Sequence, residues 1–163
     1  MPKAPISIRS IETRDCDALY AIDQACFPHG VAYSKWEIRW FLSRRGAFGY
    51  LAELESGGGE GASGSSTVGF VVAWKVDHKA GHIITLDILE PYRRRRIGSA
   101  LMKKVEEEFH RACIRVALLE VSVNNTTAQQ FYRKFGYEVS DRLKKYYPTG
   151  EDAFEMVRWF EEQ

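Results

Sequence analysis

HIITLDILEPYRRRRIGSALM, residues 82–102, places a strand-like run, a basic turn and the start of a helix in direct succession. Its first eight residues are mostly isoleucine, leucine and threonine, a composition that predicts a β-strand. After the turn, Leu101, Val105 and Phe109 recur at four-residue spacing, which predicts a helix from about 97 to 112. A strand that passes through a short turn into a helix is a building unit of α/β and α+β sheets.

The segments on either side continue this alternation of strands and helices. The patterns predict strands at 6–11, 47–54, 67–75, 114–123, 137–143 and 153–160, and helices at 15–26, 35–45 and from about 126 to 135. With the central stretch included, the order is βααβββαβαββ. This order indicates an α/β (α+β) fold in which about four helices flank both faces of a mixed sheet of about seven strands.

Cap residues mark where two of these helices begin and end. Ser34 is expected to accept the first free N–H groups of the helix that follows it. On that helix, Trp36, Trp40 and Phe41 mark one side at helical spacing. Gly136 follows the last predicted helix directly, where a glycine commonly takes the left-handed conformation after a C-cap.

The low-complexity stretch SGGGEGASGSS, residues 56–66, contains almost nothing that a core could bury. It could separate two domains, but the 55 residues before it are few for an independent core, and strands are predicted on both of its sides. We therefore expect a flexible hairpin loop within one sheet, and a single domain over residues 1–163.

Composition and charge exclude several functional classes. The chain has 163 residues, 45% of them hydrophobic and 28% charged, as in an ordinary globular domain. A net charge of +1 gives no general attraction to nucleic acid or to an anionic membrane, and no apolar run approaches the about 20 residues of a membrane-spanning helix. Three cysteines without a CxxC pair indicate neither a disulfide framework nor a metal site. We expect a cytoplasmic protein.

The four arginines, Arg93, Arg94, Arg95 and Arg96, lie between a predicted strand and a predicted helix start. Unpaired N–H groups and the helix dipole favour an anion there, and arginines can add forked hydrogen bonds to a pyrophosphate. A solvated basic turn is the alternative. A nucleic-acid site is disfavoured, because no basic face or aromatic platform accompanies the cluster.

Three motifs carry a resemblance to a known family. RRRRIG (93–98) resembles the Arg/Gln-x-x-Gly-x-Gly/Ala loop that binds the pyrophosphate of acetyl-CoA in the GNAT superfamily of N-acetyltransferases. LEVSVNNTTAQQFYRKFGYE (119–138) is similar to that family's strand, Asn-x-x-Ala helix and Phe-Tyr-x-x-x-Gly-Phe/Tyr segment. KKYYPTGEDAFEM (144–156) resembles protein N-terminal acetyltransferases, especially RimI-like enzymes. The motifs span about 82 to 158, roughly half of the chain, and imply the GNAT fold.

The resemblance implies acetyl-CoA as the cosubstrate and assigns its contacts. These are Leu86 and Ile88 on the strand, Arg93, Arg94, Arg95, Arg96, Ile97, Gly98 and Ser99 at the turn, and Asn125 and Tyr132 at the last helix. Arg96 departs from the family pattern, because it stands where the loop has its first glycine, which permits a positive φ. We expect Arg96 to sit in a right-handed turn with its side chain directed outward.

Two side chains are candidates for the acid–base chemistry. Glu120 interrupts the otherwise apolar run VALLEVSV, where a carboxylate is costly unless it is partnered or functional. It is either a structural glutamate or, as in RimI-like enzymes at the matching position, a general base acting through water. His82 is expected to share a strand face with Ile84, Leu86 and Ile88. It aligns with a catalytic tyrosine of related eukaryotic enzymes, although a lone histidine is more often structural.

Tyr132 falls on an apolar helical stripe with Phe131 and Phe135 and is either a core aromatic or a contact of the CoA sulfur, as the resemblance implies. Reference pKa values of about 10 for tyrosine and about 8.5 for a thiol make full proton transfer unfavourable, so we expect a hydrogen bond to the thiolate. The family's oxyanion donor, a backbone N–H, would lie near Ile88. Asn125 would cap its helix and contact the pantetheine arm.

The tail favours a protein α-amino terminus as the acetyl acceptor. In the family, paired tyrosines, here Tyr146 and Tyr147, line the peptide N-terminus, and Phe27 and Pro28 stand where the first side chain is held. At pH 7, neutralising an α-amino group costs about 1 kcal/mol and neutralising a lysine about 4.6 kcal/mol, which favours the N-terminus for a single water-linked Glu. Phe27 and Pro28 could equally be a helix terminator and a core aromatic.

Two other functions stay open at this point. The chain could acetylate a small amine such as a polyamine or an amino acid, or it could be a non-catalytic acetyl-CoA-binding sensor or partner subunit. Arg96 is the feature that hints at the second possibility, and the presence of Glu120 and Tyr132 argues against it. We expect a monomer or weak dimer with a protein or peptide N-terminus as its substrate, a ribosomal protein being the family's best-known bacterial target.

Overall fold

The computed structural model describes residues 5–55 and 66–161. Its strands are β1 (Ile6–Ser10), β2 (Ala47–Leu54), β3 (Ser66–Lys75), β4 (Ala80–Ile88), β5 (Val116–Ser122), β6 (Glu138–Leu143) and β7 (Ala153–Trp159). Its helices are α1 (Cys16–Cys26), α2 (Lys35–Ser43), α3 (Ile97–Arg111) and α4 (Thr126–Lys134), with 3₁₀ turns at Thr13–Asp15 and Glu90–Tyr92. The predicted order of elements and the mixed α/β class are confirmed.

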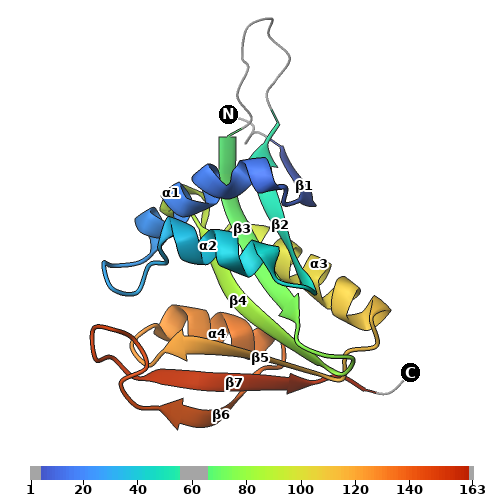
Figure 1. Cartoon of the computed structure of the whole chain (residues 1–163), viewed down its shortest axis with the longest axis vertical. Coiled ribbons are helices and arrows are strands. Elements are labelled where there is room, and N and C mark those ends of the chain that lie inside the picture. Colours follow the sequence, from blue (N-terminus) through green and yellow to red (C-terminus); the bar gives the residue numbers. More distant parts are fainter. Residues whose placement is uncertain (1–4, 56–65, 162–163) are drawn as a thin grey trace, which may run out of the picture.

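The strands of the described residues form one seven-stranded sheet in the order β1-β2-β3-β4-β5-β7-β6 (Figure 1). All neighbours are antiparallel except β4 and β5, which run parallel. β2 and β3 pair as the hairpin prediction requires, and Ser66 already belongs to β3. The rest of the predicted loop, 56–65, lies outside the described residues.

The parallel pairing of β4 with β5 is short, and this shortness creates the site. It runs only from Ala80, opposite Val116, to His82, opposite Leu118, whereas β4 stays paired with β3 as far as Ile88. Beyond His82 the two parallel strands diverge, and the sheet opens into two parts (Figure 1). One edge of β4 is therefore left without a strand on the β5 side.

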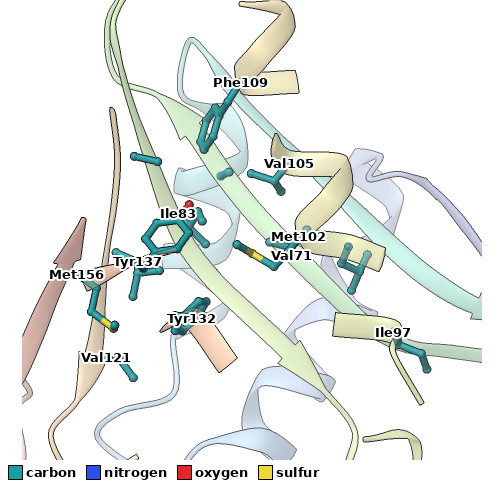
Figure 2. Packing of buried hydrophobic residues seen from close by; sticks show 14 of the residues in the cluster. Val71, Ile83, Ile97, Met102, Val105, Phe109, Val121, Tyr132, Tyr137 and Met156 are labelled. Carbon is teal, nitrogen blue, oxygen red and sulfur yellow. The ribbon is translucent and has the colours of Figure 1, made fainter. Parts of the chain in front are cut away.

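Helices cover both faces of the sheet, as predicted. α1 and α2 lie in front of it in the view of Figure 1 and bury residues such as Leu19 and Ile38 in a smaller core. α3 and α4 cover the opposite face, where the main core lies (Figure 2). The predicted stripe Leu101, Val105 and Phe109 is fully buried in that core.

α2 differs from its predicted orientation. Ser34 caps it as expected, since its hydroxyl accepts from the Glu37 N–H at 3.2 Å. The expectation that Trp36, Trp40 and Phe41 share one side is wrong, because Trp36 is 69% exposed whereas Phe41 packs on the smaller core. The two tryptophans stack on each other on the outer side of the helix, with ring centroids 6.2 Å apart.

β4 contains a bulge that changes which side chains share a face. Val72 pairs with Thr85 and Ala73 with Ile83, so Ile84 is an extra residue. Ile84 packs on the α1/α2 side, whereas Leu86 and Ile88 pack on the α3/α4 side. The prediction that Ile84, Leu86 and Ile88 lie on one face with His82 is therefore wrong, because one inserted residue reverses the alternation.

Candidate active site

A cavity of about 360 Å³ lies where β4 and β5 diverge. Five segments line it: the α1–α2 connection (26–33), β4 (83–86), the β5 end (119–125), α4, and the β6–β7 loop (146–151). The splayed strands supply its floor, and the two loops supply walls from opposite parts of the chain.

Glu120 and His82 meet beside this cavity. Glu120 lines it, and its Oε2 lies 2.7 Å from His82 Nε2. Both side chains are largely buried, 15% exposed for Glu120 and 21% for His82. Sequence reasoning singled out each of them separately, whereas the contact between them depends on the parallel pairing of β4 with β5. The arrangement gives a carboxylate whose position is held by an imidazole.

α4 brings Asn125 and Tyr132 to the same cavity. The Asn125 side-chain oxygen accepts from the Ala128 N–H at 3.1 Å, which confirms the predicted cap, and Gly136 closes the helix at φ 84°. Tyr132 is 8% exposed and packs in the main core beside Tyr137 (Figure 2), so it is both a core aromatic and a cavity residue.

The hydroxyl of Tyr132 is held in its protonated form. Burial raises its pKa well above the ordinary tyrosine value, and the negative charge of Asp87 raises it further. A phenol of high pKa is a poor proton source for complete transfer but remains a hydrogen-bond donor. Tyr132 therefore suits the stabilisation of a negatively charged sulfur at the cavity.

Aromatic and apolar side chains form the other walls. Phe27 and Pro28 come directly after α1 and line the cavity from one side. Tyr146 and Tyr147 line it from the β6–β7 loop, with their rings perpendicular and their centroids 5.0 Å apart. Burial raises the pKa of Tyr146 to about 12, so its hydroxyl also stays neutral. The structure thus brings all four predicted acceptor-side residues to one cavity.

Tyr33 is a cavity residue that the sequence did not reveal. It lies in the α1–α2 connection, and its pKa is raised by burial and by the proximity of Tyr146, Tyr147 and Glu120. Its backbone N–H donates to Asp23 Oδ2 at 2.6 Å. No periodic pattern marks a tyrosine in a short connection. The one available signal is its position directly before Ser34, the cap of α2.

The arginine turn has a geometry opposite to the one expected at Arg96. Arg96 is the N-cap of α3 at φ 62° and ψ 14°, so the prediction of a right-handed turn is wrong. Arg94 is also left-handed, at φ 58°. The chain must reverse between the end of β4 and Ile97, the first residue of α3, and left-handed residues make that reversal. Left-handed residues in a turn can direct neighbouring N–H groups toward a common concave side, an arrangement that binds anions.

The other predicted cofactor contacts fall into two groups. Leu86 lies at the cavity. The Ile88 side chain packs against the main core, and the Ile88 carbonyl accepts from Arg93 Nε at 2.8 Å. Gly98 and Ser99 lie in the first turn of α3, where N–H groups have no helical partner. A free edge of β4 joins the cavity to this turn, which fits an elongated molecule with a thiol at one end and phosphates at the other.

Within 5–55 and 66–161, no cluster of three or more His, Cys, Asp or Glu side chains is arranged to hold a metal ion. None of the helices in those two ranges is both long enough and apolar enough to span a membrane.

Comparison with known proteins places this geometry in a family. Residues 16–137 match the model of the acetyltransferase (GNAT) family. The chain is 33% identical over 152 residues to an uncharacterized N-acetyltransferase of Methanocaldococcus jannaschii, a match covering 93% of this chain and 90% of that protein. It is 28% identical over 164 residues to an N-alpha-acetyltransferase of Sulfurisphaera tokodaii, covering 92% and 90%.

A solved structure shares the fold over nearly the full length. Arabidopsis thaliana Naa50 in complex with the bisubstrate analogue CoA-Ac-MVNAL superimposes with a TM-score of 0.75 at 25% identity, covering 95% of this chain and 99% of that one. The splayed strands, the turn before α3 and these matches agree. The chain belongs to the acetyltransferase (GNAT) family and is an acetyl-CoA-dependent N-acetyltransferase.

Proposed function

We propose that this enzyme transfers the acetyl group of acetyl-CoA to the α-amino terminus of a protein or peptide. The observation that carries the proposal is the composition of the cavity: the Glu120 carboxylate lies among aromatic and apolar walls built by Phe27, Pro28 and the tyrosine pair, and a second carboxylate, Glu151, lies on the β6–β7 loop. The N-alpha-acetyltransferase from Sulfurisphaera tokodaii and the peptide portion of the analogue bound to Naa50 point to the same acceptor class.

Glu120 is assigned the role of proton acceptor through a water molecule. An α-amino group loses its proton near neutral pH, so a carboxylate with one bridging water is sufficient, whereas a lysine side chain needs a much stronger driving force. His82, 2.7 Å from Glu120, orients the carboxylate and offers a second nitrogen through which the proton can leave. The neutral amine nitrogen then attacks the thioester carbon, the C–S bond breaks to release the CoA thiolate, and the proton lost by the new amide nitrogen passes to that thiolate.

The developing charges are assigned to β4 and α4. The carbonyl oxygen would face a backbone N–H on the free edge of β4, in the segment 83–86 that lines the cavity. This segment lines the same cavity as Glu120, whereas Ile88, near which the sequence placed the donor, is not among the lining residues. The Tyr132 hydroxyl donates a hydrogen bond to the thiolate, and the pyrophosphate lies on the N-terminus of α3 with the arginine turn around it.

The acceptor walls define how the N-terminus would enter. Phe27 and Pro28 form an apolar side that suits the first side chain, and Tyr146 and Tyr147 face it with neutral hydroxyl groups. These hydroxyls can bond the peptide carbonyl and N–H groups. A free polyamine has no carbonyl or amide group that could bond these hydroxyls.

A direct acetylation assay tests the proposal. Peptides with free α-amino groups, including N-termini of ribosomal proteins, are compared with N-terminally blocked lysine peptides, free amino acids and polyamines, with mass spectrometry locating the acetyl group. We expect α-amino acetylation at least about 100-fold faster than lysine acetylation, given the difference in pKa. Faster transfer to a polyamine than to any peptide would sink the proposal.

The Glu120→Gln variant is the control for chemistry. The amide keeps the size of the side chain but cannot accept a proton at neutral pH. We expect kcat to fall about 10²-fold or more and the acidic limb of the pH–rate profile to flatten. Acetyl-CoA binding should persist, which thermal stabilisation by the cosubstrate would show. Unchanged turnover would remove Glu120 from the base role.

A further inference from the structure

Two carboxyl groups outside the chemistry described so far are fully buried between α1 and β4. Asp23, on α1, is 0% exposed, and Asp87, on β4, is 1% exposed. Carboxylates are almost never buried to this degree without compensation, because removing a charge from water is costly. The two groups lie close enough that each affects the ionisation of the other.

Each carboxyl has one satisfied oxygen and one orphan. Asp23 Oδ2 accepts from the Tyr33 N–H at 2.6 Å, and Asp87 Oδ1 accepts from the Thr85 hydroxyl at 2.5 Å. Among the described residues, Asp23 Oδ1 and Asp87 Oδ2 are buried without a hydrogen-bond partner. A proton between the two carboxyls would satisfy both orphan atoms at once.

The electrostatics of the pair agree with a shared proton. Burial raises the pKa of Asp23 to about 6, and burial together with the nearby Asp23 charge holds the pKa of Asp87 well above its usual range. Two adjacent carboxyls in a dry site cannot both ionise easily. After the first proton has left, the remaining proton is therefore retained to higher pH. The pair titrates as a unit.

The pair joins the two halves of the active site. On the acceptor side, Asp23 holds Tyr33, which lines the cavity, and Gln24 Nε2 donates to the Tyr33 carbonyl at 2.8 Å. On the cofactor side, the residue after Asp87 is Ile88, whose carbonyl accepts from Arg93 at 2.8 Å at the start of the arginine turn. A change in the protonation of the pair would therefore alter the position of Tyr33 in the cavity wall.

We propose that Asp23 and Asp87 share one proton, and that this proton holds Tyr33 in the position in which it lines the acceptor side of the cavity. When the proton leaves, two facing carboxylates repel, the Asp23–Tyr33 contact shifts, and acceptor binding weakens. The proposal rests on the proposed function in that the occupant of this wall is a peptide N-terminus.

Other groups facing the pair do not account for a change between about pH 6 and about pH 9. They are Cys26 on α1, Tyr33, Glu37 on α2, Arg93, and Tyr132 on α4. Burial raises the pKa of the Cys26 thiol and of both tyrosines, so these groups stay neutral. The Arg93 charge lowers the pKa of Asp87, and Glu37 adds a negative charge that raises the pKa of Asp23.

The test uses a ligand that does not titrate. An N-terminally acetylated peptide, the reaction product, is titrated calorimetrically between about pH 6 and about pH 9 into enzyme loaded with desulfo-CoA, which lacks the titrating thiol. We expect the wild-type Kd to rise about tenfold or more across this range. A change of about tenfold in Kd is what a difference of one pKa unit between the free and the peptide-bound enzyme produces. Asp87→Asn replaces the proton with a permanent N–H donor and keeps the charge of the singly protonated pair. Its Kd should change less than about twofold.

Two further variants separate positioning from simple structural support. Asp87→Ala leaves Asp23 buried and unpaired, so it should weaken binding at every pH, whereas Asp87→Asn should restore the tight form. Asp23→Asn should flatten the pH profile as Asp87→Asn does. Equal pH profiles in wild type and Asp87→Asn, or a wild-type Kd independent of pH, would overturn the proposal.

A second measurement tests the shared proton even if no peptide binds. The Tyr33 amide donates to Asp23, so its hydrogen exchange by NMR reports the contact directly. At about pH 9 we expect exchange about tenfold faster in wild type than in Asp87→Asn, and equal rates at about pH 6. Equal rates throughout would contradict the shared proton, whereas absence of peptide binding alone would count against the proposed function.

Discussion

Arg96 illustrates how a single residue can conflict with its family pattern and still be accommodated. Its φ of 62° is the conformation that the usual glycine would take without strain, and an arginine there costs about 1 kcal/mol. In the proposed phosphate site the backbone N–H groups of the α3 terminus, not the Cβ atom of Arg96, would contact the anion. Arg96 thus takes the left-handed conformation that the glycine of the motif permits.

Replacing Arg96 with glycine should therefore stabilise the protein. We expect Arg96→Gly to raise the free energy of unfolding by about 1 kcal/mol and to change the acetyl-CoA Kd less than about tenfold. Chemical denaturation and calorimetry measure the two effects. Arg95→Gly is the matched control, since Arg95 is not left-handed and its guanidinium lies 5.4 Å from the Tyr92 ring centroid. A gain as large in the control would show that strain at Arg96 is not the cause.

The sequence identified those candidate site residues that stand out within a local pattern or a family motif. Glu120 stands out in an apolar strand, and Tyr132 falls on both a helical stripe and a family motif. Tyr33 and the Asp23–Asp87 pair could not be found in the same way. Their roles depend on contacts between α1, its following loop and β4, which no short-range spacing encodes.

At the scale of elements, the boundaries of strands and helices followed the sequence closely, whereas their irregularities did not. α3 begins at Ile97 as predicted, and β2 has its predicted bounds at Ala47–Leu54. The extra residue Ile84 in β4 and the short β4–β5 pairing leave no mark in the composition of either strand. Both features arise from register, which tertiary packing decides.

Two glycines at the ends of the β4–α3 unit should respond oppositely to alanine. A Cβ at Gly98 would stand 3.5 Å from Phe131, an ordinary contact, and alanine is the better helix former. We expect Gly98→Ala to stabilise the protein by about 0.5 kcal/mol or more and to change acetyl-CoA binding little, because the methyl group would face Phe131 and Ile88 and the motif admits alanine at this position. Thermal unfolding and calorimetry separate these effects.

Gly81→Ala is the matched control for that experiment. A Cβ at Gly81 would stand 2.5 Å from the Phe109 ring, which packs β4 against α3. We expect a loss of about 1 to 3 kcal/mol of stability from this overpacking. Acetyl-CoA affinity per folded molecule should change little. A loss of stability in Gly98→Ala as large as that in Gly81→Ala would show that the space beside Phe131 does not admit a methyl group.

For the whole molecule, two sets of buried carboxyls act on stability in opposite directions as pH changes. Hydrogen bonds from Arg9, which also contacts Glu53, lower the pKa of Asp15. The contribution of Asp15 to the free energy of unfolding is therefore present above its unfolded pKa of about 3.9 and is lost as the pH falls through its native pKa. Asp23 and Asp87 have raised pKa values, so the native state binds more protons than the unfolded state. Their contribution is therefore lost as pH rises from about 4 through the native pKa values.

This opposition predicts the stability profile of Asp87→Asn. The amide cannot ionise, so the variant should match wild type near pH 4 and become more stable by about 1 kcal/mol or more near pH 8, since one pKa unit corresponds to about 1.4 kcal/mol. Asp15→Asn is the control, with an effect on stability of opposite sign, because it weakens the ion pair with Arg9. This variant should be less stable than wild type near pH 8, and the difference in stability should shrink toward pH 3. Thermal unfolding across this range measures both. A constant offset for Asp87→Asn at every pH would mean that the pair does not titrate, and that α1 and β4 are joined by packing alone.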